Sequence, residues 1–223
     1  MSEALCKICG LTRPQDVELC QYLGVDITGF IFAGSSPRAV SVEAAAAMPR
    51  GPALRAGVFA GADARVVLNT AQQARLDLIQ LHGGEDVPFC RAVGPERVIK
   101  VLWPERMKPG ALEQELERFA PVAAYFLLDV GISGGGSGKA LALEDLWRVI
   151  PPRPWFLAGG LGHLNLDRTL AAFAAFASAP VGVDLNSALE NAPGIKNHAL
   201  IRRAMTILNN YNGHKPATLE KHP

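Results

Sequence analysis

The sequence predicts an α/β protein with a single domain, a (β/α)8 or TIM barrel. Three features predict this fold: apolar runs alternate with amphipathic segments, most apolar runs are unbroken like parallel strands buried on both faces, and eight such pairs fill about 210 residues. A doubly wound sheet shows the same alternation, but it usually has fewer strands and a Gly-x-Gly-x-x-Gly turn after the first. Here the first turn reads Cys9-Gly10-Leu11-Thr12, which does not match.

The expected strands are the short apolar runs. They cover residues 5–9, 27–32, 53–59, 76–82, 97–103, 124–129, 155–158 and 181–185. Such runs suit strands that have packed side chains inside the barrel and helices outside it.

The expected helices lie between the strands, and several have clear start signals. Pro14 suits the first helical position, while Ser41 and Asn197 suit the N-cap positions of the second and the last helix. The helices are expected over residues 14–23, 42–48, 63–74, 86–92, 112–119, 143–149, 165–176 and 198–209. The barrel domain then spans residues 1–211, and the polar stretch 212–223 is expected to be a disordered tail.

The composition excludes several classes of function. The chain is 49% hydrophobic and 19% charged with a formal net charge of +1, so no overall field attracts nucleic acid or a membrane surface. No apolar run reaches the roughly 18 residues of a membrane span, and the start lacks a secretory leader. The 4 cysteines show no disulfide-rich spacing, which is typical of a reduced cytoplasmic protein.

Two residues at strand ends suggest the chemistry, because barrel enzymes carry their active sites at the C-terminal ends of the strands. Cys9 ends the first expected strand and Asp129 ends the sixth. When a thiol and a carboxylate face one cleft, one can remove a proton while the other donates one. This pairing suits an isomerase that needs no cofactor.

The residues around Cys9 allow other interpretations. Cys6 and Cys9 form a Cys-x-x-Cys pattern, but residues three apart on a strand point to opposite faces and cannot share a metal ion. Lys7 shares a face with Cys9, and an inward-facing ammonium there would stabilise the thiolate. The alternative is that Cys9 is simply a small core residue.

Arg38 and His82 follow the second and fourth expected strands. The forked guanidinium of Arg38 suits a carboxylate, and His82 suits a hydrogen bond within the site. The alternatives are an exposed loop arginine and a histidine that merely ends a strand. The histidines lack metal-ligand spacing, so no metal is expected.

The glycine-rich segment 131–139 superficially resembles a P-loop. It lacks the Ser or Thr that would follow the lysine of such a loop, because Lys139 is followed by Ala140. Gly135, Gly136, Ser137 and Gly138 are instead expected to form a lid over the sixth strand. An ordinary flexible surface loop is the alternative.

The last two strands are followed by segments that suit phosphate. Gly159 and Gly160 follow the seventh strand, and Asn186 and Ser187 follow the eighth. In barrels this pair of loops commonly forms a phosphate site from backbone amides and a short helix, which Asn186 or Ser187 would cap. Two ordinary turns are the alternative.

Taken together, these segments resemble a known family. The resemblance is carried, in order, by residues 7–12, 29–32, 36–38, 80–83, 128–129, 135–138, 157–161, 182–187 and 193–196. They resemble the phosphoribosylanthranilate isomerase family of tryptophan biosynthesis over about residues 5–210.

The resemblance implies a concrete reaction without a cofactor. In this family N-(5-phosphoribosyl)anthranilate undergoes an Amadori rearrangement to 1-(2-carboxyphenylamino)-1-deoxyribulose 5-phosphate. By resemblance, Asp129 is the general acid that opens the furanose ring to an iminium, and Cys9 is the general base that takes the proton from the sugar C2 atom. The iminium is itself the electron sink, so neither pyridoxal nor a metal is needed.

The resemblance also implies how the substrate binds. Arg38 would hold the anthranilate carboxylate, with His82 and Lys7 on the same side. The loops at Gly159-Gly160 and Asn186-Ser187 would hold the phosphate, whose binding helps to orient the reacting carbon. The expected partner is a small phosphosugar rather than nucleic acid or a membrane, and the chain is expected to be a monomer or a homodimer.

Two other functions stay open at this stage. A phosphosugar epimerase of the same barrel type usually needs metal-ligand histidines and acids at strand ends, which the sequence does not show. A non-catalytic phosphosugar-binding barrel, or an isomerase with an altered substrate range, would fit the segment 139–143 and Ala188, which depart from the family's usual residues.

Overall fold

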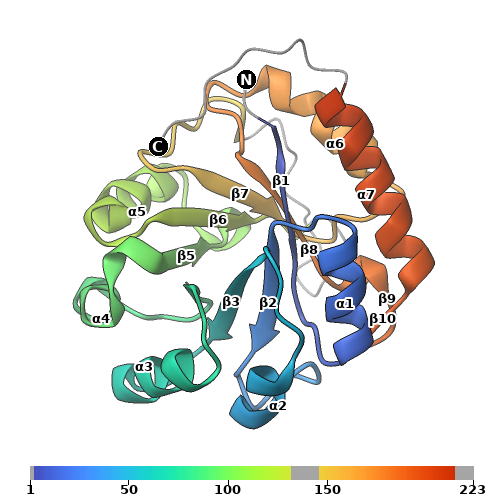
Figure 1. Cartoon of the computed structure of the whole chain (residues 1–223). Helices are drawn as coiled ribbons and strands as arrows, with labels where there is room; N and C mark the ends of the chain where they lie inside the picture. The colour runs from blue at the N-terminus through green and yellow to red at the C-terminus, as the bar shows by residue number, and fades with distance from the viewer. Residues whose placement is uncertain (1–2, 132–145, 214–223) are drawn as a thin grey trace.

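Eight parallel strands close into a barrel in chain order, with β8 pairing back onto β1. The computed structural model describes residues 3–131 and 146–213, and in it the helices surround the strands (Figure 1). The strands are β1 (Leu5–Ile8), β2 (Ile27–Ile31), β3 (Leu54–Phe59), β4 (Leu78–Leu81), β5 (Val98–Leu102), β6 (Tyr125–Asp129), β7 (Trp155–Ala158) and β8 (Gly182–Leu185). The predicted single-domain (β/α)8 barrel is confirmed.

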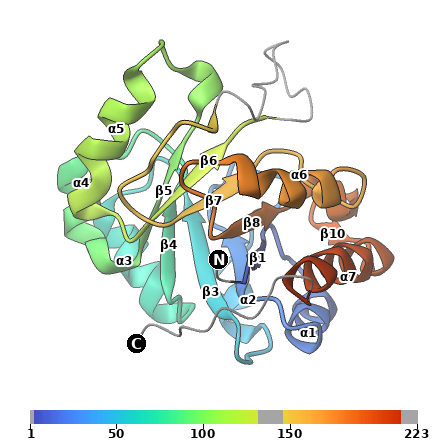
Figure 2. The ribbon, with the colours of Figure 1, turned by 90° about the horizontal axis from the view of Figure 1, so that it is seen from above.

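The helices cover the outside of this ring. The α-helices are α1 (Pro14–Tyr22), α2 (Val42–Ala47), α3 (Ala64–Gln73), α4 (Val87–Val93), α5 (Ala111–Phe119), α6 (Leu166–Ala172) and α7 (His198–Gly213). Short 3-10 turns are η1 (Pro95–Arg97), η2 (Pro104–Arg106), η3 (Ala120–Val122), η5 (Phe173–Ala175) and η6 (Ser187–Leu189). On one flank of the barrel α7 packs beside α1 and α6 (Figure 2).

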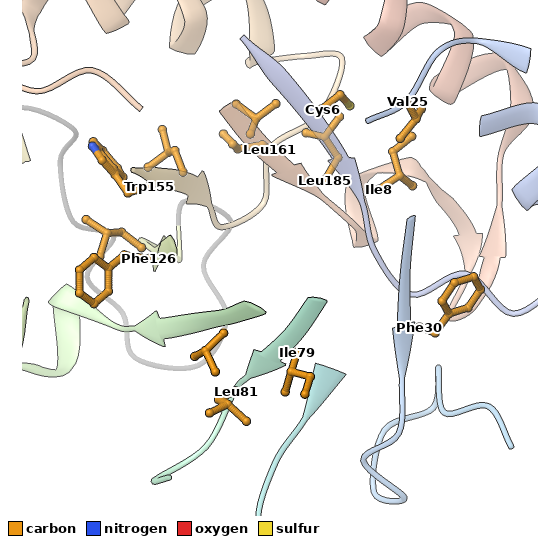
Figure 3. Close-up of a cluster of buried hydrophobic side chains, with 14 of the residues drawn as sticks. Cys6, Ile8, Val25, Phe30, Ile79, Leu81, Phe126, Trp155, Leu161 and Leu185 are labelled. Atoms are coloured by element: carbon orange, nitrogen blue, oxygen red, sulfur yellow. The ribbon is translucent and has the colours of Figure 1, made fainter. Parts of the chain in front are cut away.

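Side chains alternate between two buried layers. On β1 and β4, Cys6, Ile8, Ile79 and Leu81 point outward and pack under the helices (Figure 3). The opposite face of the strands fills the barrel interior, with a cluster formed by Ile27, Ala56, Leu78, Ile99, Val101, Leu127, Phe156 and Ala158. Because each strand is buried on both faces, its sequence is a nearly continuous apolar run.

Several helix starts confirm the expected caps. The Ser41 hydroxyl accepts a hydrogen bond from the Ala44 N–H at 3.1 Å. Asn197 does the same for the start of α7, accepting from the N–H groups of Ala199 at 2.9 Å and Leu200 at 3.1 Å. Pro14 is the first residue of α1. These contacts satisfy N–H groups that have no partner inside the helix.

The structure differs from the sequence prediction at some boundaries. The helix expected over residues 143–149 lies partly outside the described residues, and residues 147–148 form a turn. The expected helix 165–176 is shorter, because α6 passes into the 3-10 turn η5. A short antiparallel hairpin of β9 (Glu190–Ala192) and β10 (Ile195–Lys196), which was not predicted, follows β8.

The first two residues of the tail predicted over 212–223 are helical, because α7 continues to Gly213. Asn212, expected to be the first tail residue, accepts a hydrogen bond from the Ala4 N–H at 2.9 Å and donates one to the Ala4 carbonyl at 3.2 Å. These two bonds tie the end of α7 to the start of β1, which explains why the helix extends past residue 211. Residues 214–223 lie outside the described residues.

Candidate active site

A cavity of about 520 Å³ opens at the C-terminal ends of the barrel strands. This is the end of the barrel at which enzymes of this fold carry their sites. The predicted residues that line it are Cys9, Arg38, His82, Asp129, Gly159, Gly160, Asn186 and Ser187. Residues from strand ends far apart in the sequence therefore meet around one space that can hold a small ligand.

Asp129 ends β6, and its carboxylate lies against the loop that follows β7. Its Oδ1 accepts a hydrogen bond from the Gly131 N–H at 3.3 Å. Gly159 has a φ of +113°, and a Cβ atom there would lie 2.9 Å from this Oδ1 and 2.5 Å from the Gly131 nitrogen. Only glycine combines this φ with so close an approach. The predicted lid residues Gly135, Gly136, Ser137 and Gly138, which follow along the chain, lie outside the described residues.

Cys9 directly follows β1 and faces β2 across the mouth of the barrel. A Cβ atom at Gly29 of β2 would lie 2.9 Å from the Cys9 Sγ and 3.1 Å from the Lys7 Nζ. Because Gly29 has no side chain, the thiol and the ammonium have room to lie together. Burial raises the pKa of the Cys9 thiol, while the charge of Lys7 lowers it in part.

Lys7 lies beneath the cavity rather than in its lining. It is fully buried and donates a hydrogen bond from Nζ to the Asp184 Oδ1 at 3.0 Å. Lys7 and Asp184 are register partners on β1 and β8, so both side chains project into the barrel, as strand alternation predicts for Lys7. Burial acts to lower the pKa of Lys7, but Asp184 and Cys9 outweigh it and raise that pKa, which keeps the ammonium charged.

Arg38 is bound side-on by a carboxylate that the sequence analysis did not assign. Its Nε donates to both oxygens of Glu190 at 3.0 Å, and its Nη2 donates to Oε2 at 2.7 Å. Among the described residues, none forms a hydrogen bond or ion pair with its Nη1. Arg38 is therefore not a free loop arginine, because Glu190 fixes its side chain in an ion pair. The Nη1 side of its guanidinium is available to a ligand.

A buried lysine connects Glu190 to the loop after β8. The Nζ of Lys196 donates to Glu190 Oε1 at 2.9 Å, to the Asn186 carbonyl at 3.1 Å and to the Asn186 Oδ1 at 2.8 Å. Asn186 is the N-cap residue of η6, but its side chain makes no cap hydrogen bond. The expectation that Asn186 caps the short helix is therefore wrong, because its amide oxygen is engaged by Lys196.

The two loops expected to bind phosphate lie side by side. Gly159 and Gly160 both have positive φ, at +113° and +64°, so their backbone can approach a ligand closely. Next along this loop, a Cβ atom at Gly162 would lie 2.6 Å from the Cβ of Ala188 in η6. Ala188 does not have positive φ, so alanine is accommodated at this position without backbone strain.

His82 follows β4 and is held by an aromatic neighbour. Its ring meets the Trp103 ring edge-on, with 5.1 Å between centroids and 90° between planes. Burial lowers the pKa of His82, so the ring is neutral near pH 7. Its Nδ1 is buried and has no hydrogen-bond partner among the described residues, which leaves it available to a ligand.

Three residues of this site carried no assigned role from sequence: Asp184, Glu190 and Lys196. Asp184 had a usable signal, because it interrupts an apolar strand and the closure of a barrel places β8 beside β1, where Lys7 is the charged residue. Glu190 and Lys196 had no comparable signal, since both lie in the short β9–β10 hairpin, whose contacts depend on how the loops pack, although Lys196 belongs to the segment 193–196 that carried the resemblance.

Metal binding and membrane crossing each need a feature that the described residues do not show. Among residues 3–131 and 146–213, no group of three or more His, Cys, Asp and Glu side chains is arranged to hold a metal ion. No helix within these ranges is long and apolar enough to cross a membrane.

Comparisons with known proteins give a consistent result. Residues 6–206 match the family described as "PRAI: N-(5'phosphoribosyl)anthranilate (PRA) isomerase". The chain is 44% identical over 212 residues to the N-(5'-phosphoribosyl)anthranilate isomerase of Desulfovibrio desulfuricans, covering 95% of this chain and 98% of that protein.

Two solved structures match the fold over nearly its whole length. One is a phosphoribosylanthranilate isomerase in complex with reduced 1-(o-carboxyphenylamino)-1-deoxyribulose 5-phosphate (TM-score 0.73, 27% identity, covering 93% of this chain and 99% of that chain). The other describes mutually generated monomers of the dimeric enzyme from Thermotoga maritima (TM-score 0.75, 28% identity, covering 92% of this chain and 98% of that chain).

The fold and the cavity together define a (β/α)8-barrel enzyme with a thiol, a carboxylate and a bound arginine around a single site. Enzymes of this fold work with residues at the C-terminal strand ends, where these groups lie. Within that class, the chain belongs to the N-(5'-phosphoribosyl)anthranilate isomerase family.

Proposed function

We propose that this protein converts N-(5'-phosphoribosyl)anthranilate to 1-(2-carboxyphenylamino)-1-deoxyribulose 5-phosphate, the isomerase step of tryptophan biosynthesis. The observation that carries the proposal is the position of Cys9 and Asp129 on one cavity, each at the end of a barrel strand. The reaction moves protons within one molecule, so one acid and one base suffice in principle.

In the proposed mechanism Asp129 acts first, as the general acid. It donates a proton to the ring oxygen of the ribose, the C1–O bond breaks, and the nitrogen lone pair forms an iminium. Cys9 then removes the proton from C2, and the electrons of that C–H bond flow into the iminium to give an enolamine. Tautomerisation of the enolamine to the ketone completes the rearrangement, with no atom gained or lost.

Lys7 has a supporting role in this proposal. Cys9 must lose its proton to act as a base, and burial opposes the thiolate. The charged ammonium of Lys7 lies beside the sulfur and favours the thiolate. Lys7 acts from beneath the cavity, so we assign it to the base rather than to direct contact with the anthranilate.

Two groups of cavity residues suit the two ends of the substrate. Arg38 would bind the anthranilate carboxylate, and the neutral ring of His82 would donate or accept a hydrogen bond with the anthranilate part of the ligand. The backbone of Gly159 and Gly160, with Asn186 and Ser187 on the neighbouring loop, would bind the phosphate. The glycine-rich segment 135–138 remains the proposed lid.

The proposal also concerns partners and location. The related enzyme in complex with a reduced deoxyribulose phosphate compound supports a phosphosugar ligand. A related enzyme from Thermotoga maritima is described as dimeric, and we propose a monomer or a homodimer for this chain. The 4 cysteines are free, and a cytoplasmic location would keep the Cys9 thiol reduced, as its role requires.

The test follows the loss of anthranilate fluorescence after fresh phosphoribosylanthranilate is mixed with the purified protein. We expect fast decay with the wild type, and a loss of kcat of about 10²–10⁴-fold in Cys9→Ala and in Asp129→Asn, with the ligand still bound. Cys90→Ala is the matched control, because it makes the same change at a buried cysteine of α4. A folded wild type that binds the phosphosugar without turnover would instead identify a binding protein.

A further inference from the structure

Glu190 occupies an unusual place for a carboxylate beside a substrate-binding arginine. Its side chain is only 4% exposed, and it lies between two cations, Arg38 on one side and Lys196 on the other. It also accepts a hydrogen bond from the Gly194 N–H at 3.1 Å, so the β9–β10 hairpin holds it in position. Each of these contacts restricts how the carboxylate can turn.

The direction of the contacts on Arg38 is the informative feature. Glu190 binds the edge formed by Nε and Nη2. A guanidinium presents a second edge, formed by Nη1 and Nη2, that can receive another carboxylate with two parallel hydrogen bonds. Arg38 lines the cavity, and among the described residues its Nη1 is not used. Binding by Glu190 therefore fixes the plane of the guanidinium while leaving this second edge to a ligand.

Lys196 keeps the carboxylate charged and in place. Burial acts to raise the pKa of Glu190, but Arg38 and Lys196 outweigh it and hold that pKa below its ordinary value. Arg38 and Lys196 together carry two positive charges against the single negative charge of Glu190. The cluster therefore keeps a net positive charge at the side of the cavity where an anionic ligand would bind.

We propose, on the basis of the proposed function, that Glu190 is a positioning residue. It orients Arg38 so that the edge formed by Nη1 and Nη2 faces the carboxylate of the substrate. Glu190 acts through Arg38 and does not touch the ligand. Its effect is therefore on discrimination between ligands that carry this carboxylate and ligands that lack it.

The experiment measures that discrimination by calorimetry. The probes are reduced 1-(o-carboxyphenylamino)-1-deoxyribulose 5-phosphate and the same compound without its carboxylate. The ratio of the two dissociation constants cancels any general effect of a variant on the fold or on the phosphate loops. We expect Glu190→Gln to reduce the wild-type preference for the carboxylate compound by about tenfold.

Two more variants test whether Glu190 acts through Arg38. Arg38→Ala is expected to lose the preference, and adding Glu190→Gln to it is expected to change the ratio no further, since the group that Glu190 positions is then absent. Glu115→Gln is the matched control: it makes the same change in an exposed pair, 3.1 Å from Arg118 on α5, and is expected to leave the ratio as in the wild type.

The outcomes separate this inference from the proposed reaction. An unchanged ratio in Glu190→Gln, with both compounds weakened equally, would give Glu190 a structural role only, and a higher ratio would make it a competitor of the substrate. If Glu190→Gln fails to fold because Lys196 is left unpaired, the variant Glu190→Gln/Lys196→Met removes both charges and carries the test. Turnover of phosphoribosylanthranilate by the wild type is measured separately. A wild type without this activity would overturn the proposed reaction, whereas the ratio of dissociation constants alone decides the role of Glu190.

Discussion

Around Cys9 the cavity is held by charges, whereas around Asp129 it is held by close packing. The Cys9 wall, taken together with the residues directly behind the lining, consists of Lys7, Asp184, Arg38, Glu190 and Lys196, which are connected to one another or to Cys9 by ion pairs and close contacts. The Asp129 wall consists of Gly131, Gly159, His82 and Trp103, where backbone and rings meet without a buried ion pair among these residues. The difference indicates that the proposed base, Cys9, depends on the balance of the charges near it, whereas the proposed acid, Asp129, depends on the space that the neighbouring glycines leave around its carboxylate.

The largest expected effect tests the charge balance beneath Cys9. Lys7→Met leaves Asp184 buried without its partner, so we expect the free energy of unfolding to fall by about 3–5 kcal/mol, measured by urea unfolding. The double variant Lys7→Met/Asp184→Leu removes both charges and is expected to lose much less. Equal losses in the single and the double variant would contradict a role for charge in this wall.

The next effect tests space in the Asp129 wall. In Gly159→Ala the new Cβ atom would collide with the Asp129 carboxylate and the Gly131 nitrogen. We expect this to displace the carboxylate by about 1 Å and to lower kcat by roughly 100-fold. Gly24→Ala is the control, because Gly24 also has positive φ but has no atom within 4 Å of the added Cβ. Steady-state kinetics with a melting curve distinguish the two, and an equal loss of activity in both would point to backbone strain alone.

The pH dependence separates charge from general damage in the Cys9 wall. Burial raises the thiol pKa, Lys7 lowers it and Asp184 raises it further. The base form is lost as pH falls, so kcat/KM is expected to rise with pH. The rising limb should move to higher pH in Lys7→Met and to lower pH in Asp184→Asn. Shifts in the same direction would contradict this account.

The smallest effect concerns a charge beside the Asp129 wall. Arg106 pairs with Glu105 at 3.2 Å, but the arginine side chain is 67% exposed. Solvent screens such pairs, so Arg106→Gln is expected to change the free energy of unfolding by no more than about 0.5 kcal/mol in thermal unfolding. A loss comparable to that of Lys7→Met would remove the contrast between the two walls.

The sequence was sufficient for the parts of the fold that depend on local patterns. Unbroken apolar runs, which suit strands buried on both faces, predicted all eight strands. Ser41 and Asn197 were predicted as N-caps because a cap depends on residues close to it in the sequence. The strand ends also placed Cys9, Asp129 and His82 on one cavity, because parallel strands in a barrel end on one face.

Contacts between distant loops were not predictable in the same way. The partner of Arg38 is Glu190, 152 residues away, in a hairpin that has no strong strand pattern. The same packing engages Asn186 with Lys196 and so removes its expected cap. Likewise the extension of α7 depends on Asn212 meeting Ala4, a contact 208 residues apart. Side-chain chemistry identified candidate residues, while their partners were set by tertiary packing.

The pairing of β1 with β8 also bears on the synthesis of the chain. Lys7 meets Asp184 across 177 residues, and the other charged partners in the Cys9 wall, apart from Arg38, follow still later in the sequence. A ribosome releases Cys9 early, together with Lys7 and then Arg38, but Asp184, Glu190 and Lys196 emerge only near the end. Loops this long close slowly. Cys9 therefore has Lys7 beside it from the start but lacks Asp184, Glu190 and Lys196 for most of translation, and the site becomes competent only after the last strand has joined the first.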